Sequence, residues 1–280
     1  MFYIKHNTDN FTIIDCSLAE SSKDAITSEL ITASKGVGIV RFISTHPDED
    51  HIRGLKHLNQ KLGLQNFYCV KNEATKEDET EDFQEYCALR ESSKAFFIYK
   101  GCSRKWMNLD GDGRSNSGIN ILWPNTNNEI FQAELLEAKN GLSPNNISPI
   151  IRYGVDGSGS AIWMGDLEEW FMEDIAGELK LRQTDIVFAP HHGRDSGKIP
   201  DSLLKILDPK IIVVGEAPSK HLHYYPNHNT ITQNSSGDIA FQLESGSIHI
   251  YVSNENYSVD FLNDLKQKNS HGFYIGSLTV

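Results

Sequence analysis

One stretch of the sequence constrains the fold most strongly, because a largely apolar run leads directly into acidic and imidazole side chains. Residues 37–43 are rich in strand-forming residues, which predicts a buried strand. Four potential metal ligands follow within six residues, namely His46, Asp48, Asp50 and His51. Gathered at the rigid end of a strand, two carboxylates and two imidazoles would be strongly destabilising without a counter-charge. A pair of divalent cations would supply it, and these oxygen and nitrogen donors suit zinc, manganese or iron.

The same residues have a simpler interpretation as a solvated acidic turn before a helix. We expect that helix to run from His51 to about Leu62, because Ile52, Leu55 and Leu58 recur near helical spacing. Asp50 would then be an ordinary N-cap residue. The rest of the chain favours the metal site.

Two later strands also end in potential ligands. The strand at 161–164 leads into Asp166, whose carboxylate could bridge two metals, although an N-cap role would explain it as well. The strand at 185–189 precedes His191 and His192. Neighbouring side chains of a strand point to opposite faces, so we expect only one of the two histidines to ligate. Either His191 or His192 could be that ligand, and the other would orient substrate or protonate a leaving group; we place His191 with the ligands and His192 with the catalytic residues.

Three further polar residues are candidates for substrate contacts. Asn146 and Ser148 enter a strand and could orient a phosphate or complete a coordination shell, although a turn with a cap explains them equally well. His223 lies in the histidine-rich loop 220–228, whose composition suits the rim of an active site.

Charge limits the possible partners. The net charge is −12, with 38 acidic and 26 basic residues. Proteins that make long non-specific contacts with nucleic-acid backbone are usually basic. Any nucleic-acid contact should therefore be local or mediated by metal.

Cysteine usage and hydropathy predict a cytoplasmic protein without a membrane partner. The four cysteines are scattered and form no Cys-x-x-Cys pair, which argues for reduced thiols rather than disulfides or a zinc knot. No apolar run approaches the roughly 18–20 residues that span a bilayer, and the N-terminus lacks a signal-peptide pattern.

Strand-like and helix-like stretches alternate along the chain, which predicts an α/β fold. Without a visible linker or repeat, we expect a single domain over 1–280. We predict a charged insert near 71–94, whose part from 71 to 85 reads as a solvated helix or insert, and a C-terminal extension near 254–280.

Taken together and in this order, the motifs resemble those of the metallo-β-lactamase superfamily. They are most similar to the hydrolase domain of ComEC-type DNA-uptake proteins, which also carries aspartate at the second ligand position, here Asp48. The similarity extends over roughly 11–251, without the membrane channel of the uptake proteins. It rests on the following motifs: His46-x-Asp48-x-Asp50-His51, Asn146-x-Ser148, Gly165-Asp166 and Pro190-His191-His192-Gly193.

The resemblance implies an αββα sandwich with a dinuclear metal centre and hydrolysis of phosphodiesters, most simply as a nuclease. The metals would be zinc or manganese, with magnesium possible, and the acidic second ligand favours the harder ions. We expect six metal ligands, namely His46, Asp48, Asp50, His51, Asp166 and His191. We expect three catalytic residues, namely Asp50, Asp166 and His192.

Three other functions are compatible with these motifs. Two are small-molecule hydrolases, either a cyclic-nucleotide phosphodiesterase or a lactonase, and the acidic net charge favours a small substrate. The third is a metal-binding regulatory module with protein partners in a multi-component system that handles foreign DNA. A nearly complete ligand set argues against that module, because structural sites seldom keep open positions.

Overall fold

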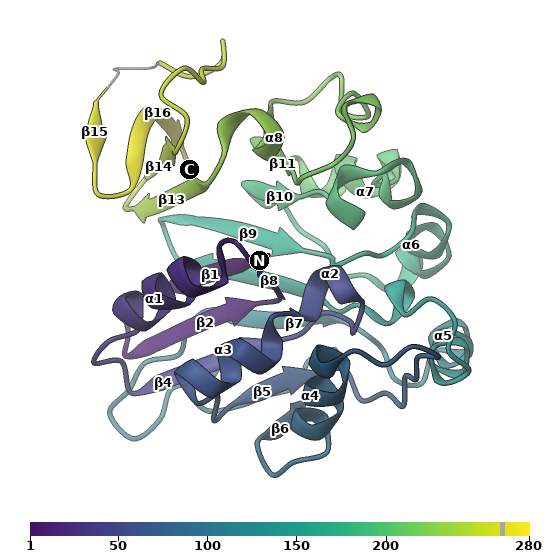
Figure 1. Cartoon of the computed structure of the whole chain (residues 1–280). Coiled ribbons are helices and arrows are strands. Elements are labelled where there is room, and N and C mark those ends of the chain that lie inside the picture. The colour runs from purple at the N-terminus through teal and green to yellow at the C-terminus, as the bar shows by residue number, and fades with distance from the viewer. Residues whose placement is uncertain (264–266) are drawn as a thin grey trace. The chain divides into compact units, whose positions relative to one another are not determined.

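A computed structural model describes residues 1–263 and 267–280 (Figure 1). Its contacts divide the chain into two compact units, Met1–Pro149 and Ile150–Val280. We call them the N-terminal and the C-terminal unit. Both contain helices and strands, in parallel as well as antiparallel pairs, so the predicted mixed α/β class is confirmed.

The N-terminal unit is built on a five-stranded sheet with the order β1-β2-β4-β5-β6. Strand β1 is antiparallel to β2, and every other neighbouring pair is parallel. The parallel strands therefore end at one edge of the sheet. Their bounds are β1 (Phe2–Lys5), β2 (Asn10–Ile14), β4 (Ile39–Ile43), β5 (Phe67–Cys69) and β6 (Ala95–Phe97). The unit also contains β3 (Cys16–Ser17) and β7 (Ile119–Trp123).

The core of this unit lies between the sheet and helices on one of its faces (Figure 1). Alternate strand residues such as Phe11, Phe42 and Phe67 join Leu30 and Leu58 there, as the two-residue period of a strand requires. Helices α1 (Lys23–Ala33), α2 (Glu49–Ile52), α3 (Leu55–Leu62) and α4 (Glu81–Arg90) contribute to this core. The unit also contains α5 (Glu129–Lys139) and a 3₁₀ turn, η1 (Asn145–Ile147).

The single helix predicted from His51 to Leu62 is wrong, because the chain breaks it into α2 and α3. Gly54 separates them with φ of +82°, a conformation that favours glycine. A Cβ atom there would also lie 2.6 Å from Leu18 Cβ. Asp82 of α4 accepts hydrogen bonds from the backbone N–H groups of Gly54 and Lys56, at 2.7 and 2.9 Å. A carboxylate therefore satisfies the first donors of α3.

The stretch predicted to be solvated over 71–85 is exposed at most of its positions, but the helix that begins within it, α4, belongs to the core. Thr80 caps α4 by accepting a hydrogen bond from the Phe83 N–H at 3.1 Å. Phe83, Tyr86 and Leu89 are buried in the core described above. Three apolar residues at helical spacing suffice to bury one face, although charged residues dominate the stretch.

The C-terminal unit has a first sheet in which five strands follow the order β12-β11-β10-β9-β8. Strands β9 to β12 are parallel, and β8 is antiparallel to β9. Their bounds are β8 (Ile150–Val155), β9 (Gly159–Trp163), β10 (Ile186–Phe188), β11 (Ile211–Val214) and β12 (Thr230–Thr232). The helices are α6 (Glu169–Ile175), α7 (Asp201–Leu207) and α8 (Gln233–Ser236), with 3₁₀ turns η2 (Ala176–Glu178), η3 (His191–Gly193), η4 (Asp195–Gly197) and η5 (Ser219–His221).

A second sheet of this unit has the order β13-β14-β16-β15. Its strands are β13 (Ile239–Glu244), β14 (Ser247–Val252), β15 (Lys268–Asn269) and β16 (Gly272–Thr279). Much of the predicted C-terminal extension is thus a regular part of this sheet, while 264–266 lie outside the described residues. Among the residues described, no helix has the length and apolar character needed to cross a bilayer.

Candidate metal site

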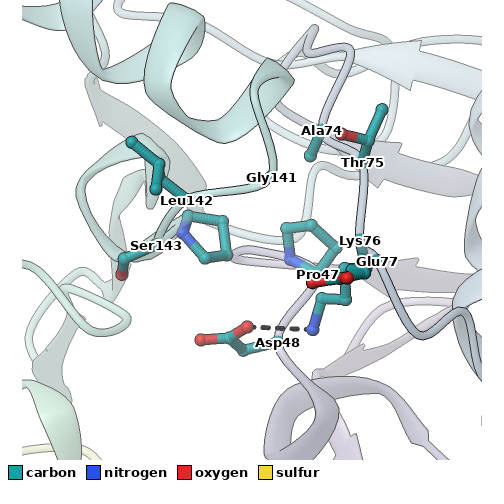
Figure 2. Close-up of a pocket in the computed structure, with 10 residues that line it drawn as sticks. Pro47, Asp48, Ala74, Thr75, Lys76, Glu77, Gly141, Leu142 and Ser143 are labelled. Carbon is teal, nitrogen blue, oxygen red and sulfur yellow. Dashed lines mark hydrogen bonds and ion pairs between the residues drawn. The ribbon is translucent and has the colours of Figure 1, made fainter.

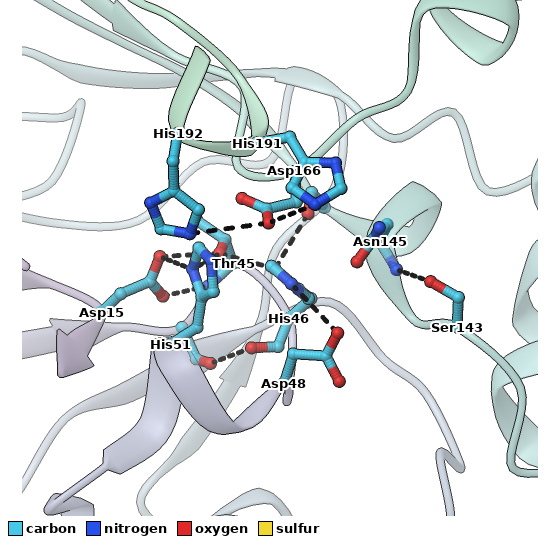
Figure 3. Close-up of polar contacts among 12 residues, drawn as sticks. Asp15, Thr45, His46, Asp48, His51, Ser143, Asn145, Asp166, His191 and His192 are labelled. Atoms are coloured by element: carbon cyan, nitrogen blue, oxygen red, sulfur yellow. Dashed lines mark hydrogen bonds and ion pairs between the residues drawn. The ribbon is translucent and has the colours of Figure 1, made fainter. Parts of the chain in front are cut away.

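Asp15 and Thr45 meet where two neighbouring strands of the N-terminal unit end. Strands β2 and β4 are parallel, with Ile14 opposite Ile43, so the residues that follow them lie side by side. Asp15 adopts φ of +54° and turns its carboxylate toward Thr45. It accepts hydrogen bonds from the Thr45 N–H and from the Thr45 hydroxyl, each at 2.7 Å. This buried pair contacts the rings of His46 and His51 (Figure 3).

His51 is held by the same carboxylate. Helix α2 follows the β4 loop and places His51 Nδ1 2.9 Å from Asp15 Oδ2. Histidines that bind metals through one ring nitrogen commonly donate the other N–H to a carboxylate. Asp50 precedes His51 on α2, and one of its carboxylate oxygens lies within 4.8 Å of a ring nitrogen of His51. The pair can therefore offer adjacent oxygen and nitrogen donors to a cation.

His46 stands beside His51 and is almost completely buried, with 1% exposed. The centroids of the two rings lie 4.1 Å apart, and one ring nitrogen of His46 lies within 4.8 Å of one ring nitrogen of His51. His46 Nδ1 contacts the hydroxyl groups of Thr45 at 3.1 Å and Ser148 at 3.2 Å. Ser148, which the sequence suggested as a substrate contact, is fully buried and lies against this ring.

Asp48 is half-buried, with 34% of its side chain exposed. It occupies the N-cap position of α2, without a capping hydrogen bond from its side chain. The simpler interpretation, in which Asp50 caps the helix, is therefore wrong, because Asp50 lies inside α2. Asp48 Oδ2 is 4.0 Å from His46 Nε2, and Asp48 Oδ1 is 2.9 Å from Lys76 Nζ.

A pocket of about 290 Å³ opens beside Asp48 (Figure 2). Lys76 contributes to one wall, and the loop 141–144 contributes to the opposite one. The pocket thus brings an ammonium group next to a candidate metal ligand.

Asn146 has a different environment from the one its motif suggested. It is buried, and its Nδ2 donates a hydrogen bond to Glu134 Oε2 of α5 at 2.9 Å. This contact ties η1 to α5.

In the C-terminal unit, Asp166 lies at the end of β9, next to the parallel strand β10. Gly165 precedes it with φ of +53° and allows the chain to turn there. The Asp166 side chain is buried, with 3% of the residue exposed.

His191 and His192 follow β10 and both approach Asp166. The Nε2 atom of each lies 3.8 Å from Asp166 Oδ2. The prediction that strand geometry sends the two rings to opposite faces is wrong, because both residues lie in the turn η3 with φ of +49° and +57°. Atoms bound to one cation at about 2.0–2.2 Å are themselves separated by roughly 3–4 Å, so this spacing suits shared coordination.

Two contacts hold His191 in place. Its backbone N–H donates to the Gly165 carbonyl at 3.0 Å, and Ser196 Oγ lies 2.9 Å from its Nδ1. Burial lowers the pKa of His191, whereas the nearby Asp166 carboxylate opposes that shift. A neutral ring is the form that ligates metals.

His223 is not gathered into this cluster. It is exposed in the loop after η5, and no hydrogen bond or ion pair joins it to another described residue of the C-terminal unit. Nothing in that unit supports its predicted role in binding substrate.

Sequence reasoning missed four residues that shape the candidate site: Asp15, Thr45, Lys76 and Ser196. Asp15, like His46, comes just after an apolar strand, and this position could have indicated it. Lys76 and Ser196 have no pattern around them. A tertiary contact brings Lys76 to Asp48, and the turn η4 brings Ser196 to His191.

The donors of each unit fit a divalent cation chemically, because they combine imidazole nitrogen with carboxylate oxygen. No protein-family model matches the chain, and no curated protein matches it.

Proposed function

We propose that this protein is a metal-dependent hydrolase of phosphodiesters. In this proposal the candidate ligands serve a centre with two divalent cations, as in the αββα sandwich that the motifs resemble. His46 and Asp48 would hold one cation, and Asp50 and His51 the other. Asp166 would bridge the two, and His191 would complete the coordination.

The observation that carries the proposal is the approach of two histidines to one buried carboxylate. His191 and His192 reach the same Asp166 oxygen at 3.8 Å, too far for hydrogen bonds. Both residues adopt positive φ to do so, which costs each of them on the order of 1–3 kcal/mol. Strain of this kind tends to be retained where function needs the geometry.

The chain's own residues would position the substrate and move protons. Asp15 and Thr45 hold the His51 and His46 rings, so the ligand nitrogens need little reorganisation when a cation binds. When bound, such cations acidify water and neutralise charge on phosphate oxygens. His192 is more exposed than His191, so we assign it the transfer of a proton to the leaving group.

The chemical class of the substrate follows from the donor set and the charge. Carboxylate-rich two-metal sites suit phosphate oxygens. A net charge of −12 disfavours long electrostatic contact with nucleic acid, so a cyclic nucleotide is the second candidate.

A panel of substrates tests the proposal. The purified chain is incubated with manganese, magnesium or zinc and with labelled single- and double-stranded DNA, RNA, cyclic nucleotides and lactones. We expect metal-dependent cleavage of a phosphodiester that is lost in Asp166→Asn. Turnover of a lactone alone would reject the substrate class. Stoichiometric metal without turnover of any substrate would favour a regulatory module.

A further inference from the structure

A second pocket in the N-terminal unit shares no residue with the candidate metal site. Its volume is about 380 Å³, within the roughly 300–1,000 Å³ typical of small-molecule sites. It is formed by β4, β5, β6 and the loop that follows, and the residues that matter most are Arg41, Tyr68, Phe96, Arg104, Lys105 and Trp106.

Arg41 gives this pocket a buried positive charge. It is fully buried, and its hydrogen bonds go to neutral oxygens at 3.0–3.1 Å, those of Thr12, Asn10, Ser117 and the Trp106 carbonyl. These contacts solvate the guanidinium and anchor the loop, but they carry no negative charge. Burial lowers the pKa of Arg41, which records the cost of that uncompensated charge.

Arg104 adds a second positive charge at the same place. Its guanidinium carbon lies 4.3 Å from the centre of the Phe96 ring and 5.4 Å from that of Tyr68. Arg41 approaches the same Tyr68 ring at 5.8 Å. Among residues 1–149, all of which the structure describes, no carboxylate forms an ion pair with either guanidinium. Two cations thus adjoin one pocket in a strongly acidic chain.

Lys105 contributes less, because Asp112 lies 3.1 Å from its ammonium group and both side chains are largely exposed. The remaining walls are aromatic. Trp106 is positioned by a hydrogen bond from its Nε1 to the Gly111 carbonyl at 2.8 Å, and Arg114 covers its ring at 4.9 Å. Phe96 and Trp106 are each only partly buried. Cations beside partly exposed aromatic rings are the features that recognise a phosphate joined to a base.

We propose that this pocket binds a nucleotide, with its phosphate at Arg104 above the buried charge of Arg41 and its base against the aromatic walls. Arginine forms paired hydrogen bonds with phosphate oxygens, and aromatic rings accept any base by stacking. The nucleotide could be free or the 5′-phosphorylated end of a single strand, since both present the same group. This site does not depend on the proposed hydrolase activity.

Isothermal titration calorimetry with the full chain tests the site, with EDTA present so that metal binding plays no part. The ligands are 5′-AMP, inorganic phosphate and a 5′-phosphorylated oligothymidylate. We expect one saturable site for 5′-AMP or the oligonucleotide, and whichever binds more tightly identifies the source. Arg104→Gln should raise Kd at least roughly tenfold, the value of one charged hydrogen-bond pair.

Two further variants sharpen the test. Arg182→Gln removes an exposed arginine from the C-terminal unit and should leave Kd unchanged. Phe96→Leu keeps an apolar side chain but removes the ring, and it should weaken 5′-AMP several-fold. The proposal is overturned if no nucleotide binds, if inorganic phosphate binds as tightly as 5′-AMP, or if both arginine variants weaken binding equally. Thermal unfolding of each variant shows that the fold is retained.

Discussion

The Asp15 carboxylate accepts a hydrogen bond from His51 Nδ1 at 2.9 Å while it also binds the backbone N–H of Thr45. One buried acid at the end of β2 thereby fixes both the loop after β4 and a ring on α2. A metal ligand held in this way has its orientation set before the cation arrives.

Replacing Asp15 by Asn should weaken metal binding by about 10–100-fold, because the amide removes the charge that supports His51. Manganese titration followed by calorimetry measures the change. Asp24→Asn, at an exposed carboxylate beside His57, is the matched control and should bind metal normally. Equal affinities for the wild-type and Asp15→Asn chains would remove Asp15 from the site.

The wild-type chain should bind close to two divalent cations, as elemental analysis after manganese or zinc supplementation would report. Asp50→Ala should lose most of this metal, since Asp50 and His51 offer adjacent donors. A chain that holds no metal under any supplementation contradicts the proposed centre. Full retention of metal and activity in Asp50→Ala would mean that the ligands lie elsewhere.

His191 and His192 should differ in the step that they affect, although both approach Asp166. We expect His191→Ala to lower metal occupancy. His192→Ala should keep the metal and reduce turnover by roughly 10²–10⁴-fold, as loss of a general acid does. Metal content and kcat are measured on the same preparations, and the assignment fails if the two variants lose metal equally.

Stability should fall in mild acid because of His6. Burial, and then the charge of Arg41, lower the pKa of His6 to about 3, and its Nε2 contacts Thr12 Oγ1 at 3.0 Å. In the unfolded chain His6 takes up a proton as the pH falls through 6.5, whereas in the folded chain it stays neutral until about pH 3. The stability that is present above pH 6.5 is therefore lost on acidification. The loss from this group should reach about 2 kcal/mol between pH 7.5 and pH 5.

Denaturant unfolding at several pH values measures that loss. His6→Gln keeps a polar side chain without the titrating ring, and it should flatten the pH dependence by this amount. If the free energy of unfolding of His6→Gln depends on pH as steeply as that of the wild-type chain, His6 does not titrate as its burial requires.

Gly54→Ala should destabilise the fold by at least about 2 kcal/mol, because positive φ and overpacking each contribute. Gly63→Ala provides the matched control, since Gly63 also has positive φ but no heavy atom lies within 4 Å of its added Cβ. We expect that variant to lose only about 1 kcal/mol. Equal losses in chemical denaturation would show that Leu18 moves aside at no cost.

Most residues of the candidate site could be predicted because they follow directly after buried strands. An apolar run that ends in polar residues is a local pattern that the sequence shows. Asp15 also follows a buried strand but is not part of a spaced motif, so the sequence alone does not single it out. The orientation of His191 and His192 could not be predicted, since two successive non-glycine residues with positive φ are rare. The break at Gly54 was hidden by apolar residues that keep helical spacing across it.

Thr45 has a consequence for the protons of both neighbouring rings. Its hydroxyl has a single hydrogen, which it gives to Asp15 at 2.7 Å, so toward His46 Nδ1 at 3.1 Å it can only accept. His46 can therefore donate a hydrogen from Nδ1 to Thr45, as His51 does to Asp15, and the Ser148 hydroxyl at 3.2 Å can accept the same hydrogen. Both neutral rings then keep their lone pair on Nε2. Asp15, which accepts from His51, and Thr45, which accepts from His46, thus favour the same tautomer in both histidines.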